Sequence, residues 1–104
     1  MFIINNVEWN IKFVPPLHPM LYRSDGSVTV GMCDNETRTI YINSTLSRKF
    51  LKKVLCHELT HAAMFSYGIE LSIEQEELLA DLIATYGEEI ILITNKIFKK
   101  LKEK

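Results

Sequence analysis

The amino-acid sequence predicts an α+β fold in which a small, mainly antiparallel sheet is followed by one helix and then by a longer helix. Two observations carry this prediction. Up to Asn43, short β-type runs alternate with turn residues, whereas the chain after Ser47 has helical periodicity that is interrupted near Gly68. Because the chain has 104 residues, we expect a single domain over residues 1–104.

The first half of the sequence predicts four short strands. The runs "FIINN" and "VEWNIKFV" flank the pair Asn5–Asn6, which tolerates positive φ and favours a tight hairpin. Two further strands are predicted for "SVTVGMC" (27–33) and "RTIYIN" (38–43), joined by the turn "DNET". If "SVTVGMC" lies at the edge of the sheet, it would be able to bind an extended peptide by strand addition.

The second half predicts helices. A helix is expected from about Arg48 to Ser66, with Ser47 as its N-cap and Gly68 in the left-handed position after its last turn. The run "SIEQ" (72–75) then has the pattern of a capping box. Apolar residues follow at intervals of three or four and predict a core stripe about six turns long: Leu79, Ile83, Tyr86, Ile90, Ile93, Ile97 and Leu101. Gly87 is expected to bend or break this helix.

Composition and charge exclude several functional classes. The net charge of −1 gives no electrostatic reason to expect nucleic acid as a partner. The N-terminal run "MFIINNVEWN" does not resemble a signal peptide, and no run of about 18 apolar residues predicts a membrane span. We therefore expect a cytoplasmic protein with no membrane partner. Its cysteines, Cys33 and Cys56, are expected to be reduced.

The run "LCHELTHAA" (55–63) contains an HExxH motif formed by His57, Glu58 and His61. A spacing of four places both imidazoles on one face of a helix, where two ring nitrogens can reach one zinc ion. Glu58 lies about 100° further around the helix, beside the metal, and can take a proton from a zinc-activated water. The alternative is a chance match in a metal-free structural domain. Three titratable residues in an otherwise uncharged helical segment favour the metal site.

The third ligand must come from another residue type, because no histidine follows His61. A carboxylate is the common alternative, and the second helix offers several. Glu77 and Asp81 lie four residues apart on one face, so that one can bind the metal while the other holds a ligand histidine by its free N–H group. Glu76 has Ala80 four residues on, and therefore no such supporter. We choose Glu77 as the ligand and Asp81 as its supporter.

The motif HExxH, followed by "EELLAD" with Glu77 and Asp81 spaced as ExxxD, resembles gluzincin metallopeptidases. The β-rich start, "HELTHA" and "EELLADLIATY" together resemble the ImmA/IrrE-type small zinc metallopeptidases of bacteria and phages, over about residues 28–86. The resemblance implies a zincin-like fold, zinc bound by His57, His61 and Glu77, a general base at Glu58 and a peptide substrate. From its 104 residues we expect no attached DNA-binding or sensor domain of the kind that larger members carry.

The expected function is therefore zinc-dependent peptide hydrolysis, acting on a specific protein or peptide substrate. The rival expectation is a zinc-containing binding or regulatory module without turnover, which the small size of the chain favours. The sequence does not rank four tyrosines as donors to the oxyanion that forms during hydrolysis: Tyr22, Tyr41, Tyr67 and Tyr86. It also leaves the oligomeric state open.

Overall fold

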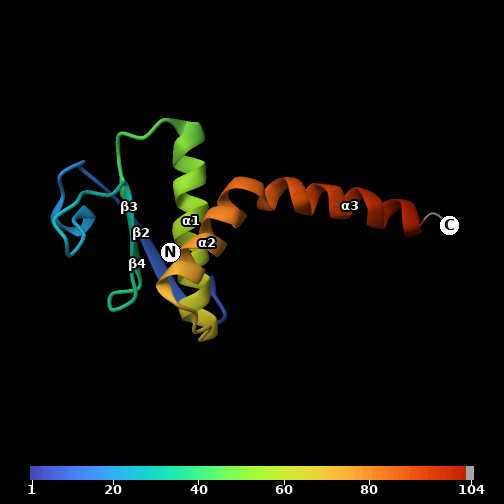
Figure 1. Cartoon of the computed structure of the whole chain (residues 1–104), viewed down its shortest axis with the longest axis horizontal. Coiled ribbons are helices and arrows are strands. Elements are labelled where there is room, and N and C mark those ends of the chain that lie inside the picture. Colours follow the sequence, from blue (N-terminus) through green and yellow to red (C-terminus); the bar gives the residue numbers. More distant parts are fainter. Residues whose placement is uncertain (103–104) are drawn as a thin grey trace.

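The structure is a computed structural model that describes residues 1–102; Glu103 and Lys104 lie outside the described residues. Figure 1 shows a small sheet with one helix along it and a long C-terminal helix that extends away from both. In chain order the elements are β1 (Phe2–Ile4), β2 (Val7–Val14), the 3-10 turn η1 (Pro19–Leu21), β3 (Gly31–Asp34), β4 (Thr39–Asn43), α1 (Arg48–Tyr67), α2 (Ile73–Leu82), the π-helical turn η2 (Ile83–Gly87) and α3 (Glu88–Lys102). The predicted α+β class is confirmed.

The sheet has the strand order β1-β2-β4-β3 and is mixed. The β1–β2 and β3–β4 pairs are antiparallel, as expected, whereas β2 and β4 run parallel. The predicted hairpin forms between β1 and β2, with φ of 48° at Asn5 and 64° at Asn6. Two successive positive φ values define the turn whose twist matches that of the flanking strands.

The strand predicted over residues 27–33 is shorter than expected, because only Gly31–Asp34 pairs with β4. The preceding residues close a loop instead. The backbone N–H and hydroxyl of Ser27 donate to the Oδ1 atom of Asp25, at 2.9 and 2.6 Å, and the N–H of Thr29 donates to the carbonyl of Leu21. Local side-chain acceptors thus compete successfully with the sheet for these backbone groups.

Helix α1 packs on the sheet through a core of Trp9, Ile40, Ile42 and Ala62, all fully buried. The indole N–H of Trp9 donates to the hydroxyl of Ser66 at 2.8 Å, and that hydroxyl donates to the Ala62 carbonyl at 2.7 Å. A buried, fully partnered indole fixes the C-terminal half of α1 against the strands. The helix ends as predicted, with Gly68 in the left-handed region at φ 65°.

The second predicted helix is divided. The capping box at Ser72 and Gln75 is present, but η2 separates α2 from α3 and ends at Gly87, near the predicted bend. Figure 1 shows the chain changing direction at this point. The predicted core stripe is wrong: Ile90, Ile93 and Ile97 are each about half exposed, because α3 projects from the body instead of packing on it. Amphipathic periodicity specifies a buried face without specifying what covers it.

Among the described residues, none of the helices combines the length and apolar character that a membrane span needs.

Candidate metal centre

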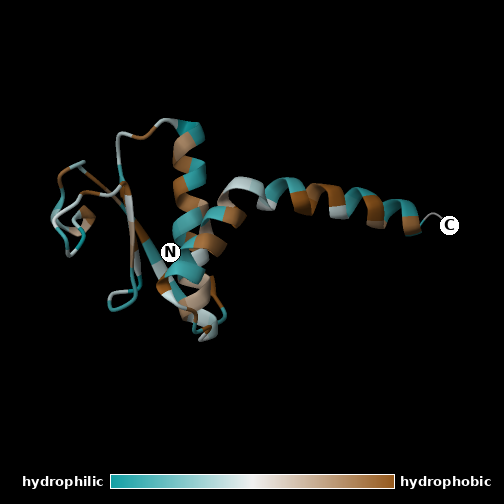
Figure 2. Ribbon diagram, viewed as in Figure 1, coloured by the Kyte–Doolittle hydropathy of each residue, from teal (hydrophilic) through white to brown (hydrophobic). Residues whose placement is uncertain are grey.

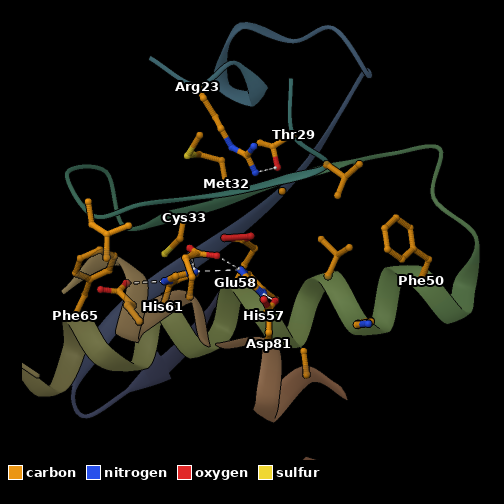
Figure 3. A pocket seen from close by; sticks show the side chains of 18 residues that line it. Arg23, Thr29, Met32, Cys33, Phe50, His57, Glu58, His61, Phe65 and Asp81 are labelled. Carbon is orange, nitrogen blue, oxygen red and sulfur yellow. Dashed lines mark hydrogen bonds and ion pairs between the residues drawn. The ribbon is translucent and has the colours of Figure 1, made fainter. Parts of the chain in front are cut away.

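The HExxH motif lies in the middle of α1 and places both histidines toward α2. The Nε2 atoms of His57 and His61 are 3.2 Å apart. Two nitrogens bound to one tetrahedral zinc ion at 2.0–2.1 Å lie about 3.3 Å apart, which matches this separation. The one-turn spacing on an uninterrupted helix therefore produces the pair that the sequence predicts (Figure 3).

Glu77 reaches the same point from α2. One of its carboxylate oxygens lies 3.2 Å from Nε2 of His57 and the other 3.0 Å from Nε2 of His61. His57, His61 and Glu77 each offer one ligand atom, and all three atoms lie within 4.8 Å of one another. The structure thus brings together the three residues predicted from the sequence as ligands, close enough to hold one metal ion.

The other ring nitrogen of each histidine contacts a carboxylate. Nδ1 of His57 lies 3.0 Å from Oδ1 of Asp81, the residue predicted to support a ligand histidine. Nδ1 of His61 lies 2.6 Å from Oε1 of Glu76, a residue for which the sequence predicts no role at the site. A signal for Glu76 was present: two histidines need two supporters, and Asp81 can serve only one of them.

Both nitrogens of each ring contact a carboxylate, because Nε2 of each histidine also lies within 3.2 Å of Glu77. With a metal ion at the Nε2 atoms, Asp81 and Glu76 would accept the Nδ1 hydrogen bonds and leave the Nε2 lone pairs for the ion. Two nitrogens and one oxygen are also a ligand set that suits zinc.

Glu58 lies beside this group and is 7 % exposed. Burial raises the pKa of its carboxyl group, and the nearby charges of His61, His57 and Arg23 oppose that rise. It lies close to Gly31 of β3, where a Cβ atom would be 3.1 Å from both Cγ and Oε2 of Glu58. The strand can approach α1 this closely only because residue 31 has no side chain.

A cavity of about 750 Å³ opens over the centre. It is lined by β3, by α1 and α2, and by the loop before β3, in which the guanidinium of Arg23 donates to the hydroxyl of Thr29 at 3.4 Å (Figure 3). Within residues 1–102, none of the four tyrosines considered as oxyanion donors lines it, whereas Arg23 and Lys53 do. Cys33, for which the sequence predicts no role beyond the core, also lines this cavity.

A comparison with protein families independently supports the family resemblance found in the sequence. Residues 17–101 match the peptidase family described as the IrrE N-terminal-like domain. This match extends on both sides of the segment that carries the sequence resemblance. Searches of curated proteins and of solved structures returned no match. The match covers most of the chain, and the histidine–carboxylate cluster lies within it. This chain therefore belongs to the IrrE N-terminal-like family of peptidases.

Proposed function

We propose that this protein is a zinc-dependent peptidase in which His57, His61 and Glu77 hold the metal and Glu58 acts as the general base. The observation that carries the proposal is the convergence of one ligand atom from each of three residues within 4.8 Å, with Nε2 of His57 3.2 Å from Nε2 of His61. Asp81 and Glu76, on the outer nitrogens, fix the tautomer and orientation of the two rings.

Zinc bound at this position supplies Lewis acidity, which lowers the pKa of water and polarises a carbonyl group. The residues of the chain provide the rest of the chemistry. Glu58 takes a proton from the attacking water as the new C–O bond forms, and then donates that proton to the amide nitrogen, which leaves as an amine when the C–N bond breaks. The raised pKa of Glu58 suits this role, because a base that must also act as an acid works best when its pKa is nearer neutrality.

The surroundings of the centre support a peptide as the substrate. Strand β3 lies at one edge of the sheet and lines the cavity. The edge of a strand presents unpaired backbone N–H and C=O groups, which an extended peptide can pair with. A peptide bound along β3 would pass over Glu58 and the histidines of α1. Apolar lining residues such as Met32, Phe50 and Phe65 would contact its side chains.

Metal content and turnover test the proposal separately. Purified protein should contain close to one zinc per chain, and it should cleave members of a fluorogenic peptide library. Glu58→Gln should retain zinc and lose cleavage, whereas Glu70→Gln, in an exposed segment outside the cavity, should retain both. Protein that binds no zinc would overturn the proposal. Protein that binds zinc tightly but cleaves no peptide would instead support a metal-containing binding module.

A further inference from the structure

Helix α3 carries a run of exposed apolar side chains. The helix continues directly from the π-helical turn η2, and the ion pair between Lys52 and Glu88, at 3.0 Å, joins its first turn to α1. The rest extends into solvent, which makes the molecule elongated at 56 × 31 × 28 Å (Figure 1). Because a single helix of 15 residues is marginally stable in water, this helix is expected to have a partner.

The apolar side chains of α3 lie mostly on one face. Ile90, Ile93, Ile97 and Leu101 recur at intervals of three and four, so they share one side of the helix. Each is about half exposed, between 49 and 58 %. Figure 2 shows the resulting alternation of hydrophobic and hydrophilic segments along α3. A contiguous exposed face of this kind marks an interaction surface.

Charged residues next to this face identify the partner. Glu89 and Lys96 are seven residues apart, two turns along the same flank, and both border one shallow depression with Ile93. If a second α3 packs antiparallel against the first, with Ile90 opposite Ile93 of the other copy, Glu89 of each copy lies beside Lys96 of the other. The two-fold axis produces this pair twice.

We propose that α3 is a homodimerisation element that pairs antiparallel with α3 of a second copy of this chain. The branched apolar residues at three–four spacing suit helix–helix packing. A net charge of −1 opposes self-association only weakly. An anionic membrane surface is the alternative occupant, because Lys99, Lys100 and Lys102 in the last turn would be attracted to it. Glu88 and Glu89 in the first turn would be repelled by it, whereas an antiparallel pair uses charges of both signs.

The first test is the mass of the full-length protein in solution. Sedimentation velocity from low micromolar to near-millimolar concentration should show a monomer–dimer equilibrium. Ile93→Asp, in the middle of the apolar face, should abolish the dimer. Asn95→Asp is the matched control, because Asn95 is exposed, lies about 160° around the helix from Ile93 and does not line the depression bordered by Glu89 and Lys96. Zinc content and circular dichroism should be the same in both variants and confirm that the body remains folded.

The second test addresses the antiparallel register. Glu89→Lys and Lys96→Glu should each turn two attractive pairs into repulsive ones and raise the dissociation constant by about tenfold. The double exchange, Glu89→Lys with Lys96→Glu, should restore wild-type affinity. Lys99→Glu, on the opposite face, should have little effect. In a parallel pair Glu89 and Lys96 would face Thr94 and Leu101 of the other copy, so the exchanges would change little.

Three results would overturn the proposal. Wild-type protein that stays monomeric at all concentrations would exclude self-association. If that monomer also binds vesicles of anionic phospholipid, α3 is a membrane-surface helix instead. A dimer that survives Ile93→Asp would place the interface elsewhere, and a double charge exchange that fails to restore affinity would exclude the antiparallel register.

Discussion

The Nδ1 atom of His61 lies 2.6 Å from the Oε1 atom of Glu76, the shortest contact between any histidine and carboxylate of the site. Only about a fifth of the Glu76 side chain is exposed, compared with about half of the Glu77 side chain. Adjacent residues of α2 thus act on one ring from two sides, with Glu76 at the outer nitrogen and Glu77 at the nitrogen that faces the metal position.

This arrangement predicts graded losses of metal affinity. Glu76→Ala removes the acceptor that orients His61 and should weaken zinc binding by about 10- to 100-fold. Glu77→Ala removes a ligand and should weaken it much more. Glu74→Ala, at an exposed position in the first turn of α2, is the control. Competition with a chromogenic chelator measures all three. A larger loss for Glu76→Ala than for Glu77→Ala would show that the ligand has been assigned to the wrong carboxylate.

Gly31→Ala should damage both stability and catalysis. The new Cβ would lie 2.8 Å from Cγ1 of Val54 and 3.1 Å from the carboxylate of Glu58, so α1 or β3 must shift. Crowding of this kind costs about 1–3 kcal/mol of the free energy of unfolding. Gly87→Ala makes the same change where the nearest atom is Cγ2 of Ile83, at 3.3 Å, and should leave peptide cleavage unchanged. Urea titration and cleavage rates measure the two effects, and an undisturbed rate in Gly31→Ala would contradict this account of Glu58.

Glu58→Gln should raise the melting temperature of the metal-free protein near neutral pH by a few degrees. Burial raises the pKa of Glu58 in the folded state, so the folded protein binds this proton more tightly than the unfolded chain does. The free energy of unfolding therefore falls as pH rises from the unfolded pKa through the folded pKa. The glutamine variant lacks this loss. Calorimetry of both proteins should show a difference at about pH 7 that vanishes below the unfolded pKa, at about pH 4; a difference independent of pH would refute the explanation.

The Cys33 thiol should resist alkylation in the folded protein. Burial, with the negative charge of Glu58 adding to it, raises its pKa to about 12. Because the thiolate is the reactive form, modification by iodoacetamide at mildly alkaline pH should be roughly a thousandfold slower than in denaturant. Peptide mapping by mass spectrometry distinguishes Cys33 from Cys56. Equal rates in the folded and denatured protein would show that the thiol is neither buried nor protonated as described.

Arg23→Ala should lower kcat/KM for peptide cleavage by about 100-fold, with zinc affinity unchanged. Arg23 lines the cavity, and its guanidinium donates to the hydroxyl of Thr29 at 3.4 Å (Figure 3). A guanidinium at this wall of the cavity can also donate to a substrate oxygen that gains negative charge. Arg48→Ala, at the first position of α1 and outside the cavity, is the control. If Arg23→Ala retained wild-type activity, Arg23 would not be the residue that stabilises the oxyanion.

Features encoded by a few neighbouring residues could be predicted from the sequence. The Asn5–Asn6 turn, the left-handed Gly68 and the capping box at Ser72 each depend on local backbone chemistry, and all three are present. The spacing of His57 and His61 likewise specifies their distance once a helix forms. These are contacts within one element or one turn, so the tertiary structure contributes little to them.

Features that depend on contacts between distant segments could not be predicted. The apolar stripe of α3 has the same periodicity whether the body covers it or not. The role of Glu76 depends on how α2 docks on α1, and the short β3 depends on a loop that binds its preceding residues. In each case a local pattern allows two arrangements, and packing elsewhere in the molecule selects between them.

The metal centre also has a consequence for how α2 is held in place. Ala80 is the one fully buried residue of α2, so apolar burial contributes little to its docking on α1. Glu76, Glu77 and Asp81, by contrast, all reach across to the two histidines of α1. Metal binding by these residues would therefore also stabilise the docking of α2 on α1. Removal of the metal by a chelator should therefore loosen the contact of α2 with α1, so that the amide protons of α2 exchange freely with solvent.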